Sequence, residues 1–512
     1  MILSTRNQGQ KHVLHLLLIA CSPAPTYVTN EIVNNNYYIE GDTGDTGELD
    51  LYVGAPEPTL IPENMTVDVF GTDGNILYLS VDPLIVADAN ENWENSYWGW
   101  SGYLYEIGEA AGVTLTNDLV VVDGTSCDSP DDFSSCSDIA SYGPVEFHIA
   151  GQSTGVAWEN LTIPNIAIDM DEAQDELTLN GTEYLRFNNG QVGSIFREAV
   201  ALEIFTALGY PAPDTSFNWL MSNMWPEGTK VPYTTVQPYK RDWCEAHADQ
   251  LGGGCTNMWE SWGDITPDWI AYLGAECQVS ECTNTRLTEA AQLIDDSLYQ
   301  PSFKELTGEY IAWDEIQTQQ CIDWILWIGD DYFHNMNNLV VVERQDGKFM
   351  MLPYSTDISL GQEWYTNTEL YGWSAIPTGC QWDNTCWADT IATCQSTVDA
   401  FQALQPTLIL DDVYMRLSDQ NMLRSGDDER YTVLWSWLSE RATEGVLEEE
   451  LENYRPSMRE LYCGSNDTGT IMDTGIVTDT GEAIVDVAAP APPPGGGWGG
   501  GDTGGNWDPC SL

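Results

Sequence analysis

The stretch GDDYFHNMNNLVVVERQDGKFMMLPYSTDISLG, residues 329–361, decides how this chain is interpreted. It contains two apolar or β-branched runs, residues 339–343 and 348–352, and the connection between them includes the dipeptide Asp346-Gly347. Asp-Gly between two such runs is a strong signal for a two-residue hairpin turn. The sequence therefore predicts a β-hairpin, with Asn338 just before its first strand and Asp357 a few residues after its second.

Polar side chains gather around the open end of this predicted hairpin. Because the two strands pair, we expect Asn338 and Asp357 to lie close in space, near the acidic pair Asp330 and Asp331. In phosphoryl transfer, one carboxylate takes the proton of the attacking hydroxyl, and an amide and a second carboxylate hold magnesium ions. These residues are candidates for such a site. The alternative is that they only cap strands and turns, as most residues of these types do.

Composition and charge limit the classes of function. The chain has 512 residues, 42% of them hydrophobic, which is enough for a large core in about two to four domains. Its 17 basic residues stand against 80 acidic ones, so the formal net charge is −63. Such a surface repels phosphate backbones, and we expect no nucleic-acid partner. Anionic ATP would also need metal ions to approach it.

The N-terminus has the pattern of an export signal. Arg6 and Lys11 precede a short, mostly apolar run, residues 13–20, which is too short to span a bilayer. The run ends in LIAC and resembles a bacterial lipoprotein box. We therefore expect cleavage before Cys21, lipid attachment to its thiol, and a membrane anchor at the outer membrane or cell surface. The alternative is a plain secretory signal in which Cys21 is incidental.

The cysteines also indicate an oxidising compartment. Thirteen are present, and setting Cys21 aside leaves twelve, an even number that suits disulfides. No C-x-x-C pair occurs and there are only five His, so we expect no structural zinc site. The local pairs that we expect are Cys127/Cys136, Cys244/Cys255, Cys277/Cys282 and Cys380/Cys386.

Changes in composition divide the chain. Short alternating runs before residue 148 predict a small β-sandwich-like domain, and helices alternating with strands after it predict an α+β domain. Repeated Asp-Thr-Gly units and a Pro/Gly-rich stretch favour disordered segments near the two ends. The predicted parts are a signal peptide (1–21), a linker (22–48), a β-rich domain (49–147), the α+β domain (148–463) and a low-complexity tail (464–512).

Two amphipathic helices are predicted in the α+β domain. Ser194 can cap the first, whose apolar residues recur every four positions until Gly209. Asp314 can cap the second, which runs to Ile328 and delivers the chain directly to Asp330. After residue 428, two further helices with acidic outer faces are expected.

Several motifs in this domain resemble those of the CotH kinases, a family named after spore coat protein H. The resemblance spans about residues 145 to 455, and its motifs occur in the family's order. The residues that carry it are Asn188-Asn189, Arg197-Glu198, the exit Gly209-Tyr210-Pro211-Ala212-Pro213, the segment VPYTTVQPYKRDW, the unit Asp330-Asp331-Tyr332, Asn337-Asn338 and the run PYSTDISLG.

The resemblance implies an atypical kinase-like fold that uses ATP with Mg²⁺ or Mn²⁺, or alternatively Ca²⁺. Its substrate would be Ser or Thr on an exported or envelope protein. In that family's terms Asp330 would be the catalytic Asp, with Asp331 as its adjacent rival. Asn338 and Asp357 would bind metal. The residues expected to bind the nucleotide are Arg186, Arg197, Glu198, Gln237 and Lys240.

The chain departs from the family pattern at several positions. Ser355 stands where many members have an additional Asp, and Gln237 stands where a Glu is usual. No obvious phosphate-binding Lys is present, so Arg186 or Lys240 would have to replace it. The run from Gly190 to Gly193 before a helix can cradle phosphate, but it serves a tight turn equally well.

Two non-catalytic functions therefore stay open. In the first, the chain is a kinase-like surface lipoprotein that binds envelope partners or calcium. In the second, it is a calcium-dependent adhesin that uses the aromatic residues of WENSYWGW, residues 93–100. No Ser-His-Asp or Cys-His arrangement suggests a hydrolase.

Overall fold

The computed structural model describes residues 68–463, all within one compact unit that spans residues 45–512. The predicted signal peptide with Cys21, the linker, the aromatic cluster of residues 93–100 and the C-terminal tail lie outside the described residues. Within the described part, no helix has the length and apolar character needed to cross a bilayer. Segments that are left out lie at 82–85, 88–114, 129–134, 151–164, 171–177, 180, 191–193, 225–228, 262, 269, 271–275, 280 and 362–368.

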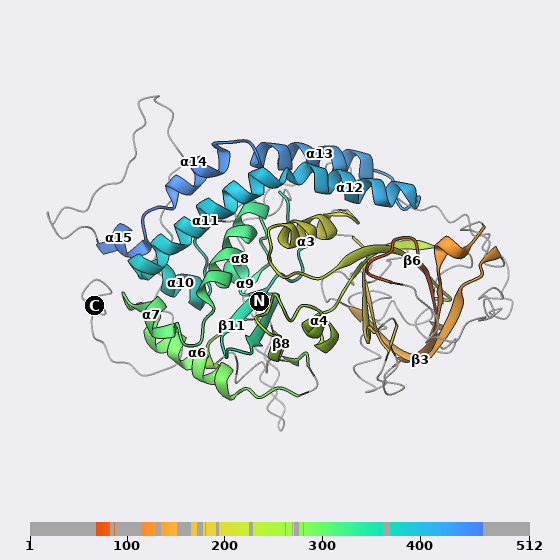
Figure 1. Ribbon diagram of the computed structural model, residues 1–512, viewed down its shortest axis with the longest axis horizontal. Coiled ribbons are helices and arrows are strands. Elements are labelled where there is room, and N and C mark those ends of the chain that lie inside the picture. The colour runs from red at the N-terminus through yellow and green to blue at the C-terminus, as the bar shows by residue number, and fades with distance from the viewer. Residues whose placement is uncertain are drawn as a thin grey trace, which may run out of the picture. The chain divides into compact units, whose positions relative to one another are not determined.

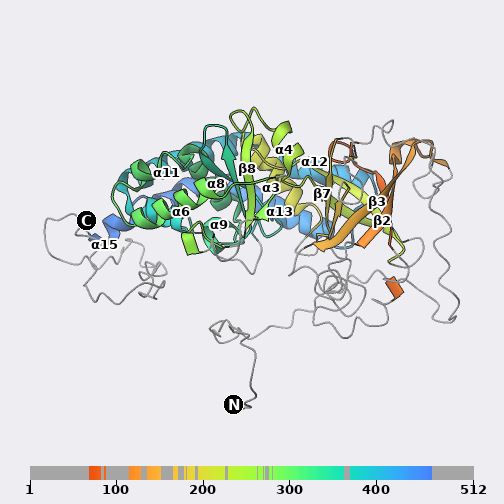
Figure 2. The ribbon, with the colours of Figure 1, turned by 90° about the horizontal axis from the view of Figure 1, so that it is seen from below.

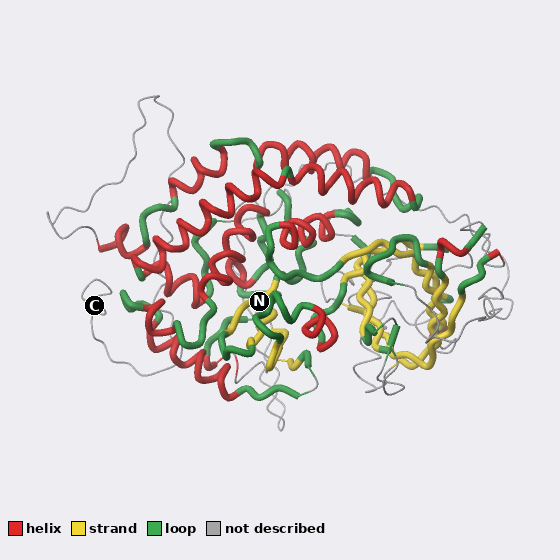
Figure 3. Tube along the Cα trace, viewed as in Figure 1, coloured by secondary structure: helices red, strands yellow, loops and turns green. Residues whose placement is uncertain are grey.

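The fold is mixed α+β, with strands in two groups and helices mainly in the C-terminal half (Figures 1 and 3). The strands are β1 (Ile76–Ser80), β2 (Leu115–Val122), β3 (Ile139–Ala150), β4 (Asn165–Asp169), β5 (Tyr184–Asn188), β6 (Thr215–Ser222), β7 (Val231–Val236), β8 (Cys255–Ser261), β9 (Glu276–Cys277), β10 (Leu339–Arg344) and β11 (Phe349–Leu352). The helices are α3 (Arg197–Ala207), α4 (Arg241–Ala246), α6 (Thr285–Ser297), α7 (Phe303–Thr307), α8 (Trp313–Leu326), α9 (Tyr332–Asn335), α10 (Ala375–Trp382), α11 (Asn384–Leu404), α12 (Pro406–Asp419), α13 (Asp427–Arg441), α14 (Val446–Asn453) and α15 (Met458–Cys463).

The first seven strands form a closed barrel in the order β1-β2-β3-β4-β5-β7-β6 (Figure 1). β1 and β6 close it by parallel pairing, and the other neighbours are antiparallel. This differs from the expected small β-sandwich. The predicted boundary between residues 147 and 148 falls inside β3, and β4 to β7, expected in the next domain, belong to the same sheet.

Alternation along the strands explains the barrel core. Leu77 and Leu79 of β1 pack in the large cluster inside the barrel, whereas Ile76 and Tyr78 pack in a small cluster on its other face. Successive side chains of a strand point to opposite faces, so residues 76 to 79 pack alternately on the two faces of the sheet. The same alternation suits a sandwich or a barrel. The choice is made by the long-range pairing of β1 with β6, which also removes two exposed edges.

A second sheet of order β11-β10-β8-β9 carries the predicted hairpin. β10 and β11 pair antiparallel with Val340 opposite Leu352, and the turn glycine Gly347 has a φ of +78°, so the hairpin prediction is confirmed. Both faces of β10 are buried. Val340 packs in the core with α8 and α11, and Val341 packs in the core with α6, α7 and α10. Burial on both faces explains why the strand reads as a continuous apolar run.

The two predicted helices are also confirmed, within a residue or two at each end. Their predicted caps are wrong, because Phe196 and Ala312 occupy the N-cap positions and neither Ser194 nor Asp314 caps a helix. α3 is followed by Gly209 with a φ of +83°, and α8 ends at Leu326. Cys321, Trp324 and Ile325 lie on the buried side of α8, as expected. The closing segment forms three helices, α13, α14 and α15, rather than two.

Five disulfides join cysteines of the described part. Four are the local pairs that the sequence predicts, Cys127–Cys136, Cys244–Cys255, Cys277–Cys282 and Cys380–Cys386. The fifth, Cys321–Cys394, links α8 to α11 and was not among them. Cys463 is also disulfide-bonded.

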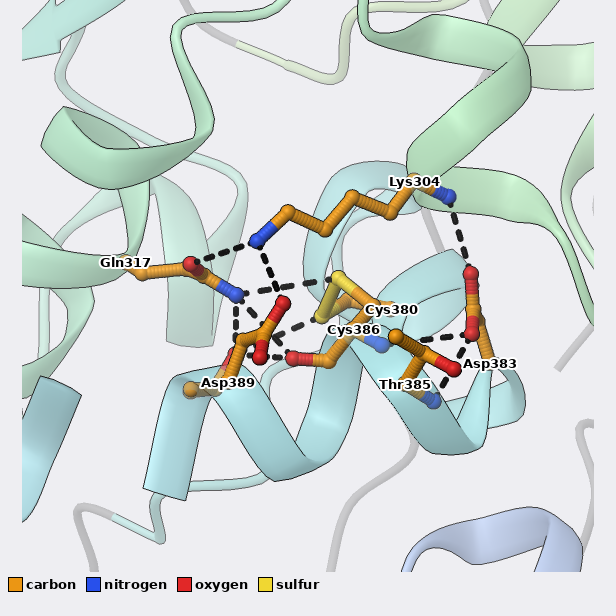
Figure 4. A network of polar contacts seen from close by, with 8 residues as sticks. Lys304, Gln317, Cys380, Asp383, Thr385, Cys386 and Asp389 are labelled. Atoms are coloured by element: carbon orange, nitrogen blue, oxygen red, sulfur yellow. Dashed lines mark hydrogen bonds and ion pairs between the residues drawn. A yellow bond between two sulfur atoms is a disulfide. The ribbon is translucent and has the colours of Figure 1, made fainter. Parts of the chain in front are cut away.

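Next to one of these disulfides, Asp383 caps two helices at once (Figure 4). Its Oδ1 accepts from the backbone N–H of Thr385 and Cys386 at the start of α11, and its Oδ2 accepts from the backbone N–H of Lys304 at the start of α7. Lys304 Nζ in turn reaches Asp389 at 2.8 Å. This cluster ties α7 and α11 together around the end of α10.

An ionic contact links the C-terminal helices to the barrel. The Arg416 guanidinium on α12 lies 2.6 Å from Asp73, just before β1, and 2.5 Å from Glu203 on α3. α12 packs directly on α3, and the two lie beside the barrel strands in the view from below (Figure 2). α3 is therefore held between α12 and the barrel strands.

Candidate functional site

The Asp330 loop begins where α8 ends. Trp327, the residue after the helix, adopts a left-handed conformation with a φ of 53°, and the next backbone N–H bonds back to the Asp323 carbonyl. A left-handed residue at a helix end satisfies orphan carbonyls and turns the chain sharply. Arg441 packs against this turn, with its guanidinium 5.3 Å from the Trp327 ring centre and 5.7 Å from that of Trp437.

Two amides hold the half-buried Asp330 carboxylate. Asn337 donates to Oδ1 at 3.0 Å, and Asn338 donates to Oδ2 at 3.1 Å and to the Asp330 carbonyl at 2.6 Å. Asn338 has a φ of 49°, a left-handed conformation that Asn tolerates better than most residues. The hairpin thus brings Asn338 to Asp330, as the sequence predicts.

Asp331, the other candidate for the catalytic Asp, has a different environment. Asp331 is 4% exposed, caps α9 by accepting from the His334 backbone N–H, and lies 2.8 Å from His334 Nδ1. Nε2 of the same ring donates to the Glu369 carbonyl at 2.6 Å. Burial lowers the pKa of His334, but Asp331 and this carbonyl outweigh it and raise the pKa overall. Asp331 is therefore engaged in a buried ion pair, and Asp330 is the better placed of the two to meet a substrate.

Asp357 lies within electrostatic reach of Asp330. Ser355 donates to its Oδ1 at 3.0 Å. Burial raises the pKa of Asp357, the Ser355 bond and the positive charge of Arg186 lower it, and the negative charge of Asp330 raises it again. A buried carboxylate whose pKa is raised by a neighbouring negative charge lies where a cation is favoured.

Asp357 also lines a pocket at the junction of β5 and α3. Glu198, from the first turn of α3, lines the same pocket and accepts a 2.5 Å hydrogen bond from Asn188 at the end of β5. Burial raises the pKa of Glu198 to about 7; Asp357 adds to this rise, and Arg186 and Asn188 oppose it. The residues that line the pocket are Asn165, Asn188, Asn189, Gly190, Ser194, Ile195, Glu198, Thr234 and Asp357.

Arg186 on β5 supplies positive charge beside this pocket. Its Nε donates to the Asn188 side chain at 3.3 Å, and its guanidinium lies 4.8 Å from the centre of the Tyr354 ring. Although burial works against its charge, Tyr354, Glu198, Glu260 and Asp357 together raise its pKa. Arg186 therefore lies within electrostatic reach of both Glu198 on α3 and Asp357 after the hairpin.

Arg197 has a positioning role in the structure. It is buried, and its Nη1 donates to the carbonyls of Ser359 and Leu360, just after Asp357. Burial and then the charge of Arg430 lower its pKa to about 10, so it stays charged at neutral pH. Arg197 thus fixes the Asp357 segment against α3.

The two remaining nucleotide-binding candidates are not among the residues that line the pocket. Lys240 Nζ lies 4.5 Å from the centre of the Tyr184 ring, and Gln237 is buried after β7 with its backbone N–H bonded to the Asp214 carbonyl. Arg186 and Arg197 are also absent from this lining, but Arg186 lies close enough to Glu198 and Asp357 for their charges to raise its pKa.

Some residues of the site could not be chosen from the sequence. Tyr354 and Glu260 bond to each other at 2.7 Å beside Arg186, and Asp323 is buried next to Asp331. The sequence contains no signal for the burial of Asp323, because it lies on the side of α8 opposite the predicted apolar face. Among the described residues, no group of three or more His, Cys, Asp or Glu is arranged to hold a metal ion.

No protein-family model matches the chain, and no curated protein sequence matches it. Among solved structures, it is similar to the proinflammatory kinase CtkA of Helicobacter pylori, with 12% identity, a TM-score of 0.28, and coverage of 57% of this chain and 94% of that one. It is also similar to a chain of the HipA, HipB and operator DNA complex of Shewanella oneidensis MR-1, with 9% identity, a TM-score of 0.26, and coverage of 61% and 65%. Both likenesses are weak, and the account of the site rests on the geometry described above.

Proposed function

We propose that this chain is a phosphotransferase that uses ATP with Mg²⁺ or Mn²⁺ and phosphorylates Ser or Thr of an exported or envelope protein. The observation that carries the proposal is the electrostatic set of Arg186, Glu198 and Asp357 around one pocket, with Asp330 in reach of Asp357. Kinases use a strand cation paired with a helix Glu, a metal-binding Asp and a catalytic Asp for this chemistry.

The pocket has features that fit a phosphate group. Gly190 has a φ of +62°, and a Cβ there would come within 2.5 Å of the Ile195 backbone, so the chain curls tightly at the entry to α3. The Ser194 hydroxyl is buried, lines the pocket and has no hydrogen-bond partner within the described residues. An unpartnered buried hydroxyl is costly, and a phosphate oxygen would satisfy it.

Each remaining residue has a specific role in this proposal. Asp357 and Asn338 would hold the divalent metal through oxygen atoms, the donors that hard cations prefer. The metal supplies positive charge that offsets the charge of the phosphates. Arg186 orients the phosphates, Glu198 orients Arg186, and Asp330 accepts the proton of the substrate hydroxyl while Asn337 and Asn338 hold it in place.

One observation favours a second candidate function, a non-catalytic scaffold that binds calcium or an envelope partner. The residues that line the pocket include two carboxylates, Glu198 and Asp357, but no Lys or Arg. Such a lining attracts a cation by itself and disfavours a nucleotide unless the metal binds too. Binding of Ca²⁺ alone, with no effect of ATP in the presence of Mg²⁺ or Mn²⁺, would favour this candidate.

The direct test is transfer of labelled phosphate from ATP to the chain itself or to a Ser/Thr-rich acceptor protein. With Mg²⁺ or Mn²⁺ we expect transfer by the wild type and a loss of about 10²- to 10⁴-fold in Asp330→Asn. Asp357→Asn should weaken metal-dependent nucleotide binding. Asp389→Asn, a largely exposed position on α11, is the matched control and should behave as wild type. Equal transfer by all four proteins would reject the assigned roles.

Export and lipid anchoring at Cys21 belong to the same proposal. The disulfides of the described part support an oxidising compartment. Metabolic labelling with a radioactive fatty acid should mark the wild type in a bacterial host. Cys21→Ser should lose the label and leave the membrane fraction, whereas retention of the label would place the modification elsewhere.

A further inference from the structure

A small buried cavity lies between three segments of the site, apart from the pocket beside Glu198. Its polar lining includes Asp323 and Gln319 of α8, Asp331 and Asn338 of the Asp330 loop, and Thr356 of the segment that precedes Asp357. The volume open to the centre of a water molecule is about 10 Å³. This is about what a single water requires, and it is too small for an organic ligand.

Buried oxygens that line this cavity have no partner. Asp323 and Thr356 are each 1% exposed, and among the described residues no hydrogen bond reaches either carboxyl oxygen of Asp323 or the hydroxyl of Thr356. The side chains of Asp331 and Gln319 lie next to the Asp323 carboxyl and influence its pKa. Buried polar groups are nearly always satisfied, by protein or by ordered water.

The polar groups of the cavity suit one water molecule. Burial, and then the negative charge of Asp331, raise the pKa of Asp323 well above its ordinary value. Asp331 is already paired with His334 at 2.8 Å. The Asp323 carboxyl and the Thr356 hydroxyl, which line one cavity of this size, match the roughly three hydrogen bonds that a buried water makes.

We propose that this cavity binds one water molecule, which joins Asp323 on α8 to Thr356 beside Asp357. Asp323 then becomes a positioning residue, because the water links the helix that carries the Asp330 loop to the segment that carries Asp357. This positioning role rests on the proposed function. The water site does not depend on it.

A double-mutant cycle on thermal unfolding tests the link without any assay of activity. Thr356→Val removes the hydroxyl at nearly constant volume, and Asp323→Leu removes both carboxyl oxygens at a similar side-chain volume. Because both changes disconnect the same water, the double variant should lower Tm by clearly less than the sum of the single variants. The matched control is Thr307→Val, a fully buried threonine of α7 bonded to the Phe303 carbonyl, which should be additive with Asp323→Leu. Additivity in both cycles would overturn the proposal.

A crystal structure that resolves ordered solvent decides what fills the cavity. We expect one water within hydrogen-bond distance of Thr356 Oγ1 and an Asp323 oxygen. Crystals grown in rubidium salts distinguish the alternative, since a cation would give an anomalous peak at this position. An empty cavity or such a peak would overturn the proposal, whether or not the protein transfers phosphate.

Kinetics then test the positioning role separately. If the wild type transfers phosphate, Thr356→Val should lower kcat by about 10- to 100-fold, the effect of a small misplacement of reacting groups, with little change in the KM for ATP. Thr356→Ser should restore kcat, because it restores the hydroxyl. An unchanged kcat in Thr356→Val would overturn the positioning role and leave the water site intact.

Discussion

Arg197 donates a hydrogen bond of 3.0 Å to the backbone carbonyl of Leu360, and this contact ties the first turn of α3 to the segment that follows Asp357. The same nitrogen also donates to the carbonyl of Ser359. Because Glu198 is the next residue along α3, the distance from Glu198 to Asp357 is fixed through Arg197. The resemblance assigned Arg197 to nucleotide binding, but in the structure its side chain joins α3 to the segment after Asp357.

Replacing Arg197 should destabilise the fold. Arg197→Met leaves two buried carbonyls without their donor, and we expect a loss of about 2–5 kcal/mol in the free energy of unfolding, measured by denaturant titration. Arg455→Met is the control, because Arg455 forms an exposed ion pair with Glu452 that contributes little. Similar losses in the two variants would contradict the positioning role of Arg197.

Glu198 should make stability depend on pH. Its pKa is raised from 4.5 to about 7 in the folded protein, so between these values the folded state binds more protons than the unfolded state. The protonated Glu198 therefore contributes to the free energy of unfolding at low pH. This contribution is lost as the pH rises from about 4.5 through about 7, and the loss is on the order of 2–3 kcal/mol. Glu198→Gln should match the wild type near pH 5 and exceed its stability at pH 8.

This comparison is made by denaturant titration in EDTA at both pH values, since a bound cation would favour the ionised carboxylate. Adding Mg²⁺ or Mn²⁺ should narrow the difference between wild type and Glu198→Gln at pH 8. A difference in stability that is the same at pH 5 and pH 8 would show that Glu198 does not titrate in this range.

The double cap formed by Asp383 should be important for stability (Figure 4). Asp383→Ala removes the acceptors for the first turns of both α7 and α11, and the loss of one helix cap usually costs about 1 kcal/mol and up to about 2. We expect a total of about 2–4 kcal/mol by thermal or denaturant unfolding. Asp389→Ala breaks only the partly exposed ion pair with Lys304 and should cost at most about 1 kcal/mol.

The Cys321–Cys394 disulfide should contribute more to stability than Cys277–Cys282. It closes a separation of 73 residues, compared with 5 for the other. In the chain-entropy description, the longer loop corresponds to about 4 kcal/mol and the shorter to about 2. The paired Cys→Ser variants, compared by thermal unfolding, should keep this order. The reverse order would mean that packing around the sulfurs, rather than loop closure, sets their contributions.

Local features of the fold could be predicted from the sequence, because they depend on neighbouring residues. The hairpin follows from an Asp-Gly turn between two apolar runs, and α8 follows from its apolar spacing. The contact of Asn338 with Asp330 is also local, since only a short loop separates them. The four short-range disulfides were predicted for the same reason.

Long-range features could not be derived from the sequence pattern. Alternation along β1 is the same in a sandwich and in a barrel, and only its pairing with β6 distinguishes them. The meeting of Glu198 with Asp357 depends on packing between distant segments. The resemblance gave five nucleotide-binding candidates, and of these only Glu198 is among the residues that line the pocket.

The most direct test of the central claim is a crystal structure with Mn²⁺ and a non-hydrolysable ATP analogue. We predict an anomalous manganese peak at the Asp357 carboxylate, with phosphates between it and Gly190 and with Arg186 directed toward them. A nucleotide bound elsewhere, or no manganese near Asp357 at saturating concentrations, would contradict the account.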